Sequence, residues 1–330
     1  MDTKTDSLVD RFGRTIDYLR VSVTDRCDLR CGYCMPSGFK GFEEPADWLT
    51  YEEIERVVAS FVRMGTRRVR LTGGEPLTRR NLSELARRLS ALPGLEDLSV
   101  STNGTRLARH AKALKLAGVN RLNVSLDSLC EQSVATITGR NCLSDVLEGL
   151  LVAQAEGLSP IKINMVVMPG VNEHQVGEMV EFCFNRGFVL RLIETMPVGQ
   201  TGRQTGWVSL DGIMQELRKA HDLVAEILPQ GGGPARYWRT RDGRGQVGVI
   251  TPMSQHFCET CNRVRLSVSG TLHLCLGQED SVSLRPYLRQ GIDDHHLDEI
   301  IRHAITLKPE RHDFSHKPEK IIRFMSQTGG

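Results

Sequence analysis

The sequence predicts an α/β protein: an incomplete (βα)6 barrel of the TIM type, followed by a smaller C-terminal α+β domain that caps its open side. Segments with strand periodicity alternate with segments of helical periodicity between residues 14 and 221. The alternation stops at a Gly/Pro run, residues 229–234. Because such a run is typical of a boundary, we expect one domain over residues 1–228 and a second over 229–330.

The expected strands are short, and a segment of helical spacing follows each of them. Leu19 and Val21 alternate with polar residues in the first strand. Thr50 and Glu53 are spaced as a capping box at the start of the first helix, and Gly65 ends it. The same reasoning predicts strands at 17–23, 67–72, 97–101, 120–125, 161–168 and 188–194, and helices at 50–65, 81–93, 106–117, 143–156, 174–186 and 210–221.

Six parallel strands leave a barrel open on one side, and the chemistry of such barrels lies at the carboxyl ends of the strands. Conspicuous residues follow five of the six expected strands. Any single Gly, Pro or Asn cluster is more often an ordinary turn, but their shared position on one rim predicts a functional site. They are the three cysteines after the first strand, residues 73–76 after the second, 102–103 after the third, Asp127 after the fourth and 196–197 after the sixth.

The cysteines after the first strand, Cys27, Cys31 and Cys34, have the spacing C-x3-C-x2-C. A [4Fe–4S] cluster usually takes four cysteine thiolates, and the next cysteine along the chain is the distant Cys130. The spacing therefore favours a cluster with one open iron. Zinc is the alternative, although its sites usually show paired Cys or Cys/His motifs. Disulfides are typical of small secreted domains, not of a chain of 330 residues.

A second set of thiols, Cys258, Cys261 and Cys275, lies in the expected C-terminal domain. A strand-turn-strand pattern about Gly270 predicts a hairpin that returns Cys275 to the neighbourhood of Cys261. Spacing alone leaves two readings open: another three-thiol cluster site, or half of a zinc ribbon completed by His256 or His273.

Cations accompany these thiols. The period of two in a strand places Arg263 and Arg265 on one face. Arg20, Arg70 and Lys162 lie on expected strands that lead to the same rim. Isolated surface arginines are common, but several cations inside a barrel are costly unless they meet an anion. The pattern predicts an anionic ligand such as a phosphate.

Composition excludes several other classes. The formal net charge of +2 gives no bulk electrostatic reason to expect nucleic acid or membrane binding. The first ten residues are polar, without the apolar core of a secretory signal, and no run of about 18 apolar residues occurs. We expect a cytoplasmic protein in a reducing compartment.

The C-x3-C-x2-C motif, with the aromatic Tyr33 before its last cysteine, resembles the signature of radical S-adenosylmethionine (SAM) enzymes. The resemblance implies that Cys27, Cys31 and Cys34 hold a [4Fe–4S] cluster whose open iron binds SAM. One electron from the cluster then cleaves SAM to methionine and a 5′-deoxyadenosyl radical. Residues 73–76 (GGEP) resemble the motif that lines the SAM amino group. By the same resemblance, the SAM contacts are Tyr33, Gly74, Ser125 and Met196.

From Phe12 onward the chain resembles the GTP 3′,8-cyclases of molybdenum cofactor biosynthesis. The likeness includes residues 22–27 (SVTDRC), residues 123–128 (NVSLDS) and the closing pair Gly329 and Gly330, which in that family reaches toward the active site. A C-terminal Gly pair is by itself more often frayed. The resemblance implies a second [4Fe–4S] cluster at Cys258, Cys261 and Cys275, with its open iron facing the guanine. It implies GTP contacts at Arg20, Arg70, Ser101, Lys162, Arg263, Val264 and Arg265; Ser101 stands where the family more often has Thr and keeps the hydroxyl.

The implied reaction converts GTP to (8S)-3′,8-cyclo-7,8-dihydroguanosine 5′-triphosphate. The deoxyadenosyl radical removes H3′ of the ribose, and the C3′ radical attacks C8 of guanine. The resemblance further implies an electron donor of the flavodoxin or ferredoxin type, and the next enzyme of the pathway, cyclic pyranopterin monophosphate synthase, as a partner through the product. The sequence leaves a homodimer open.

Two alternatives remain from the residues. A different radical SAM enzyme with an auxiliary cluster, such as a peptide-modifying maturase, would have a longer and Cys-richer C-terminal domain than this chain. A non-catalytic zinc-binding module would be colourless and contain zinc without iron.

Overall fold

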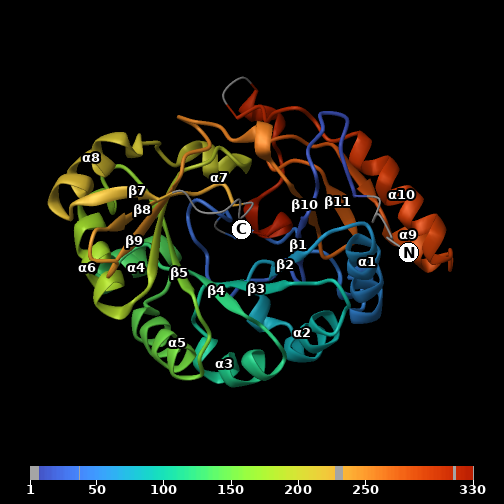
Figure 1. Ribbon diagram of the computed structural model, residues 1–330, viewed down its shortest axis with the longest axis horizontal. Helices are drawn as coiled ribbons and strands as arrows, with labels where there is room; N and C mark the ends of the chain where they lie inside the picture. Colours follow the sequence, from blue (N-terminus) through green and yellow to red (C-terminus); the bar gives the residue numbers. More distant parts are fainter. Residues whose placement is uncertain (1–6, 37, 227–232, 315–316, 330) are drawn as a thin grey trace.

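Twelve strands form one continuous sheet in the computed structural model, which describes residues 7–36, 38–226, 233–314 and 317–329. Six of these strands are parallel neighbours in chain order and curve into the wall of an open barrel (Figure 1). This confirms the expected fold class. These six strands are β1 (Tyr18–Ser22), β2 (Arg68–Thr72), β3 (Asp97–Thr102), β4 (Arg121–Ser125), β5 (Ile161–Val167) and β6 (Val189–Glu194).

Helices cover the outer side of this wall (Figure 1). The capping box expected at the first helix is present: Thr50 Oγ1 accepts the backbone N–H of Glu53 at 3.2 Å, and the Glu53 carboxylate accepts that of Thr50 at 2.8 Å. The helix then buries Ile54, Val57 and Phe61 against the sheet. The outer helices are α1 (Tyr51–Arg63), α2 (Leu82–Ser90), α3 (Leu107–Leu116), α4 (Glu131–Thr138), α5 (Leu143–Ala155), α6 (Val176–Arg186) and α8 (Leu210–Ala220).

The C-terminal region extends both edges of the barrel sheet. Strand β9 (Gln246–Ile250) pairs parallel with β6, and β10 (Arg263–Leu266) pairs parallel with β1. Antiparallel strands continue from each: β8 (Arg236–Thr240) and β7 (Leu223–Glu226) beyond β9, β11 (Thr271–His273) and β12 (Ser281–Ser283) beyond β10. The C-terminal region, which was expected to cap the barrel, therefore also forms part of its wall. The parallel strands of the sheet continue with β10 beyond β1 and with β9 beyond β6.

The position expected for the domain boundary, between residues 228 and 229, lies outside the described residues, and the division into two domains stays a prediction. Helix α10 (Asp294–Thr306) packs beside α1 (Figure 1), where Arg56 Nε contacts Asp294 Oδ1 at 2.7 Å and Arg63 Nη2 contacts Asp298 Oδ1 at 2.7 Å. This contact ties the C-terminal region to the barrel. The remaining helices are α7 (Gly199–Gln204), α9 (Arg285–Arg289) and α11 (Met325–Thr328).

Within the described ranges, no helix combines the length and apolar character needed to span a bilayer.

Candidate active site

A cavity of about 1180 Å³ lies on the inner side of the sheet. Every residue that the sequence analysis assigned to a cluster, to SAM or to GTP lines it, because the strands bring the rim residues together and β10 adds those from the C-terminal region. These residues are Cys27, Cys31, Cys34, Tyr33, Gly74, Ser125 and Met196, together with Arg20, Arg70, Ser101, Lys162, Arg263, Val264, Arg265, Cys258, Cys261 and Cys275.

The two groups of thiols lie at opposite ends of β1. Cys27, Cys31 and Cys34 follow its carboxyl end. Cys258 and Cys261 precede β10, whose first residue pairs with Tyr18 at the amino end of β1. Because β1 spans five residues and a strand rises roughly 3.3 Å per residue, the strand that separates the groups is about 13 Å long. The cavity therefore has one trio of thiols near each end of this strand.

The turn after β2 fixes the first thiol loop. The backbone N–H of Gly74 donates to Thr24 O at 2.7 Å, and that of Glu75 donates to Arg26 O at 2.8 Å. A Cβ atom at position 74 would overlap the carbonyl of Arg26. Glycine is required there because the two chain segments touch through their backbones, directly before Cys27.

Glu75 joins the turn after β2 to the turn after β3. Its carboxylate accepts three hydrogen bonds: the N–H of Leu77 at 3.0 Å, the Thr102 hydroxyl at 2.7 Å and the N–H of Asn103 at 2.6 Å. Burial raises the pKa of Glu75 to about 7, although these donors act in the opposite direction. The Asn103 amide then donates to Asp28 in the thiol loop at 2.8 Å, so this network positions the loop.

Replacing Glu75 with glutamine is expected to lower the free energy of unfolding by about 1–3 kcal/mol, because the amide nitrogen cannot accept and one buried N–H loses its partner. Guanidinium chloride unfolding of the iron-free chain at pH 7 measures this loss. Glu216→Gln, on the exposed face of α8, is the control and should stay within about 0.5 kcal/mol of the parent. Equal effects of the two substitutions would contradict the role given to Glu75.

Burial decides the protonation of the first trio of thiols. It raises the pKa of Cys27 to about 11 and that of Cys34 to about 12, and it raises the pKa of Cys31 as well. Without a cation, these thiols are neutral at pH 7. A bound metal supplies the positive charge that stabilises thiolates in such a place, so partly buried, free thiols on one loop fit a metal cluster.

The second trio lies in a more positive environment. Arg265 pairs with His273 across the hairpin, as the turn at Gly270 predicts, and Cys275 follows β11. The buried Lys308 donates to the backbone of β10 at Arg263 O, 3.1 Å. Burial raises the pKa of Cys261, but the charges of Arg263 and Lys308 outweigh it and lower that pKa to about 7. The Cys261 thiol therefore ionises readily, whereas burial raises the pKa of Cys258 and of Cys275, and a bound metal would stabilise their thiolates.

In the described part of the chain, no three Cys, His, Asp or Glu side chains are gathered closely enough to hold a single metal ion. His273, one of the residues offered for a zinc ribbon, lines the same cavity as the three thiols, and burial together with the charge of Arg323 lowers its pKa to about 3. Neither trio is therefore a preformed single-zinc site in this structure.

A row of arginines crosses the sheet between the two trios. Arg20 on β1 pairs in register with Arg265 on β10 and with Arg70 on β2, so three guanidinium groups leave adjacent strands side by side. All three line the cavity, where Arg70 and Arg265 are buried and Arg20 is half-buried. Burial, with repulsion from the neighbouring guanidinium Arg263, lowers the pKa of Arg265 to about 9. Like charges opposite one another destabilise a sheet, so this row is suited to an anion that completes it.

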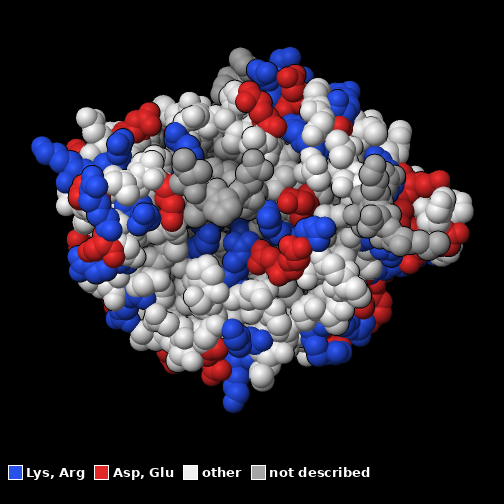
Figure 2. Space-filling model, in the orientation of Figure 1, with Lys and Arg blue, Asp and Glu red and all other residues white. Residues whose placement is uncertain are grey.

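Three buried guanidinium nitrogens of the cavity have no hydrogen-bond partner in the described structure: Nε of Arg20, of Arg191 and of Arg263. In Figure 2, Lys and Arg side chains lie in the hollow at the middle of the visible face. Sequence reasoning missed Arg191, although a charged residue in the middle of the apolar strand β6 was the available signal. It also missed further residues that line the cavity: Tyr18, Arg121 and Tyr237, whose hydroxyl lies 3.2 Å from Lys162 Nζ.

The C-terminal tail enters the same cavity. The carbonyl of Gly329 accepts a hydrogen bond from Arg265, and Met325 lines the cavity wall. A Cβ atom at position 329 would overlap the side chain of Thr72 at the end of β2. Gly330 lies outside the described residues. The tail is therefore packed against the barrel as far as Gly329. A C-terminal Gly pair, judged by composition alone, predicts a frayed end instead.

Comparisons with known proteins agree with this geometry. The family model described as Radical SAM superfamily matches residues 21–183, and the one described as Molybdenum Cofactor Synthesis C matches residues 188–314. The solved structure of Streptococcus suis SuiB bound to S-adenosylmethionine has a TM-score of 0.62 at 14% identity and covers 88% of this chain and 69% of its own; this shows the likeness of fold.

Curated relatives are much more similar in sequence. A GTP 3′,8-cyclase of Rhizobium etli is 45% identical over 98% of this chain and 94% of its own length. Proteins of the same name in Marinobacter nauticus and Pseudomonas aeruginosa are 45% and 46% identical over 98% of this chain, and 98% and 99% of their own lengths.

The barrel, the cysteine loop and the matching family model define a radical SAM enzyme, which uses a [4Fe–4S] cluster and SAM. Within that class, the chain belongs to the GTP 3′,8-cyclase family of molybdenum cofactor biosynthesis. The maturase alternative is not favoured, because the relatives match the chain over nearly its whole length.

Proposed function

We propose that this chain converts GTP to (8S)-3′,8-cyclo-7,8-dihydroguanosine 5′-triphosphate in the cavity between its two trios of thiols. The observation that carries the proposal is the arginine row of β10, β1 and β2, which lies between thiols at the two ends of β1. A cavity of about 1180 Å³ with this order of groups suits SAM at one end and a nucleoside triphosphate beside it.

The first trio, Cys27, Cys31 and Cys34, holds the cluster that SAM requires. When bound, this cluster supplies the electron that cleaves SAM and so gives the 5′-deoxyadenosyl radical that removes H3′ of GTP. Tyr33, Gly74, Ser125 and Met196 contact SAM. The Tyr33 hydroxyl donates to Asp127 Oδ2 at 2.8 Å, which holds the aromatic ring in place beside the thiols.

The second trio, Cys258, Cys261 and Cys275, would hold a second [4Fe–4S] cluster at the end of the cavity assigned to the guanine. Between the trios, the cations bind and orient the triphosphate by charge-assisted hydrogen bonds, and the buried cavity excludes water from the reacting ribose. The residues assigned to GTP are Arg20, Arg70, Ser101, Lys162, Arg263, Val264 and Arg265.

Anaerobic purification and isotope transfer test this function. The chain is expected to contain about eight iron atoms when both clusters are complete. With SAM, a reductant and GTP carrying deuterium at C3′, the deuterium should appear in 5′-deoxyadenosine. Deoxyadenosine that carries no deuterium, or material that contains zinc and no iron, would overturn the proposal.

The reaction also needs partners outside the cavity. An electron donor of the flavodoxin or ferredoxin type supplies the reducing equivalents, and cyclic pyranopterin monophosphate synthase consumes the product. A homodimer remains a prediction, and sedimentation of the anaerobic protein measures it directly.

A further inference from the structure

We propose that a surface of alternating arginine and aromatic side chains beside the first thiol loop is the docking site of an acidic one-electron carrier protein. The inference rests on the proposed function, because radical SAM cleavage consumes an electron that must reach the cluster at Cys27, Cys31 and Cys34. We call this surface the cation–aromatic patch, and it consists of Arg26, Arg30, Phe42, Trp48, Tyr51, Arg79 and Arg80.

The inner half of the patch begins on the thiol loop itself. Arg30 lies between the cysteines, and its Nη1 donates to the carbonyls of Cys27 at 2.6 Å and Leu29 at 2.8 Å. Its guanidinium carbon is 5.8 Å from the centre of the Phe42 ring, and that of Arg26 is 5.2 Å from the same ring. Arg26 and Arg30 therefore both lie within cation–π distance of the Phe42 ring.

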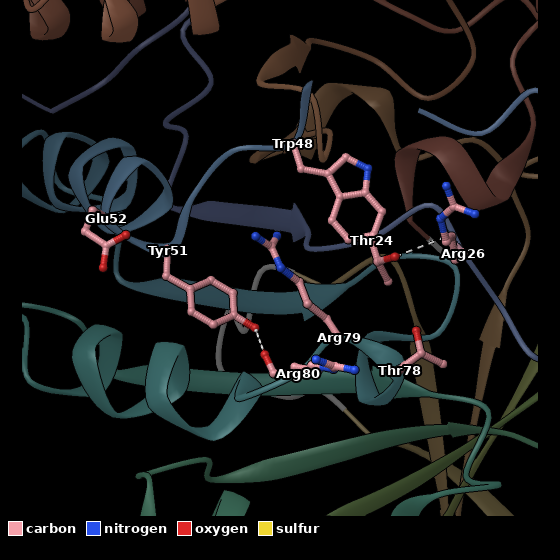
Figure 3. A pocket seen from close by; sticks show the side chains of 8 residues that line it. All are labelled: Thr24, Arg26, Trp48, Tyr51, Glu52, Thr78, Arg79 and Arg80. Atoms are coloured by element: carbon pink, nitrogen blue, oxygen red, sulfur yellow. Dashed lines mark hydrogen bonds between the residues drawn. The ribbon is translucent and has the colours of Figure 1, made fainter. Parts of the chain in front are cut away.

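The outer half continues the alternation. The Arg26 guanidinium carbon is also 5.9 Å from the centre of the Trp48 ring. The Arg79 carbon is 5.4 Å from Trp48 and 4.5 Å from Tyr51. Figure 3 shows Arg79 between these two rings and Arg26 on the far side of Trp48. Six of the seven side chains thus form a ladder that runs outward from the thiol loop, and Arg80 lines the hollow at its outer end.

A hollow of about 490 Å³ occupies the outer half, lined by Thr24, Thr78 and Glu52 as well as patch residues (Figure 3). Two hydrogen bonds to backbone carbonyls fix Arg79, because its guanidinium donates to Val23 O at 2.7 Å and to Leu49 O at 2.6 Å. The floor is consequently rigid, and a protruding side chain of a partner can enter it without reorganising the patch.

Charge favours an acidic partner. Arg26, Arg30 and Arg80 are exposed, and Lys40 is exposed nearby. Carboxylates near these residues in the chain include Glu43 and Glu44, and others are already paired: Glu52 with Arg88 at 2.8 Å, Asp47 with Arg285 at 2.9 Å and Glu53 with Arg289 at 3.3 Å. Tryptophan, tyrosine and arginine are also the residue types that dominate binding energy at protein interfaces. Complementary charge steers encounter and fixes orientation, which suits a carrier that must dock and leave quickly.

Position favours an electron carrier over other acidic proteins. Arg30 is adjacent to Cys31, so their Cα atoms are about 3.8 Å apart, while the thiol of Cys31 faces the cavity. A carrier on the patch would approach the first cluster from outside without entering the space assigned to substrate. In each transfer the carrier is oxidised by one electron and the cluster is reduced by one, and that electron then breaks the sulfur–C5′ bond of SAM.

The test uses the complete holoenzyme and an acidic flavodoxin as the probe. The variant Arg26→Glu/Arg80→Glu reverses two exposed charges of the patch and should weaken flavodoxin binding about 10-fold or more at low salt. The control, Arg218→Glu/Lys219→Glu, makes the same change of net charge on the exposed end of α8 and should leave the dissociation constant within about twofold. Raising the salt concentration should weaken the binding of flavodoxin to the parent and to the control variant. It should weaken the binding of flavodoxin to the patch variant less.

Deoxyadenosine formation supplies the second readout. With flavodoxin as reductant, the patch variant should be slower in proportion to its weaker binding, whereas with dithionite its rate should equal that of the parent. An unchanged dissociation constant would overturn the docking site, as would an equal loss of rate with both reductants. If the patch instead binds a second copy of the chain, the parent will sediment as a dimer that the variant loses, with no change in flavodoxin binding, and the proposal also fails. Failure of the proposed function would appear differently, as absence of deoxyadenosine from the dithionite-reduced parent.

Discussion

Replacing Cys31 with alanine is expected to abolish deoxyadenosine formation and cyclisation, with the iron content falling from about eight to about four atoms per chain. The reason is that the first cluster would have only two protein thiolates left, from Cys27 and Cys34. Iron analysis of the anaerobic protein and chromatography of the reaction mixture measure the two effects.

Cys275→Ala is the matched control, because it removes one thiol from the other trio. It should lower the iron content by the same amount and stop cyclisation of GTP, yet leave slow cleavage of SAM by the first cluster. If Cys275→Ala abolished SAM cleavage and Cys31→Ala preserved it, the assignment of the two trios would have to be exchanged.

Replacing Arg20 with methionine is expected to weaken GTP binding by about 10- to 150-fold, the loss of one charge-assisted contact worth roughly 1.5–3 kcal/mol. The same substitution should stabilise the ligand-free chain by about 1 kcal/mol or more. Arg20 is half-buried beside Arg70 and Arg265, and its buried Nε has no partner among the described residues. Burial, followed by repulsion from Arg265, lowers its pKa. Equilibrium binding of GTP and thermal unfolding of the ligand-free protein measure the two opposite changes.

Arg67→Met provides the comparison, because Arg67 precedes β2, is half-exposed and pairs with Glu96 at 2.8 Å. It should change neither GTP affinity nor stability by more than about 0.5 kcal/mol. A loss of stability in Arg20→Met without loss of GTP affinity would mean that the arginine row serves the fold and not the substrate.

Local signals were sufficient for the barrel because each of its elements has its own pattern. The expected strand at 161–168 differs from β5 by one residue, and the expected helix at 210–221 differs from α8 by one. Helix α4 was not expected. It has eight residues, and Val134, Thr136, Ile137 and Thr138 are β-branched, so its weak intrinsic preference is outweighed by packing against the thiol loop, where Thr138 O accepts the N–H of Arg30 at 2.8 Å.

Residues of the candidate site were predictable where a reactive or charged residue type also occurs at a characteristic spacing along the chain. Three thiols within eight residues, a Gly-Gly turn after a strand and alternating arginines each point to a ligand by residue type. Arg191 and Tyr237 carry no spacing signal, and their position in the cavity depends on which strands become neighbours. The C-terminal region was expected as a cap, and its strands β9 and β10 also complete the wall, through pairings with residues far away in the chain.

The sequence by itself determined the parallel strand-helix order, the two trios of thiols and the cations that belong with them, because these depend on residue types at short separations. Only the tertiary structure decided that Arg265, Arg20 and Arg70 stand in one row and that the trios lie at opposite ends of β1. The physical reason is that strand register across β10, β1 and β2 is set by packing of the whole sheet. Residues separated by more than 200 positions become neighbours through that packing, and no local pattern encodes it.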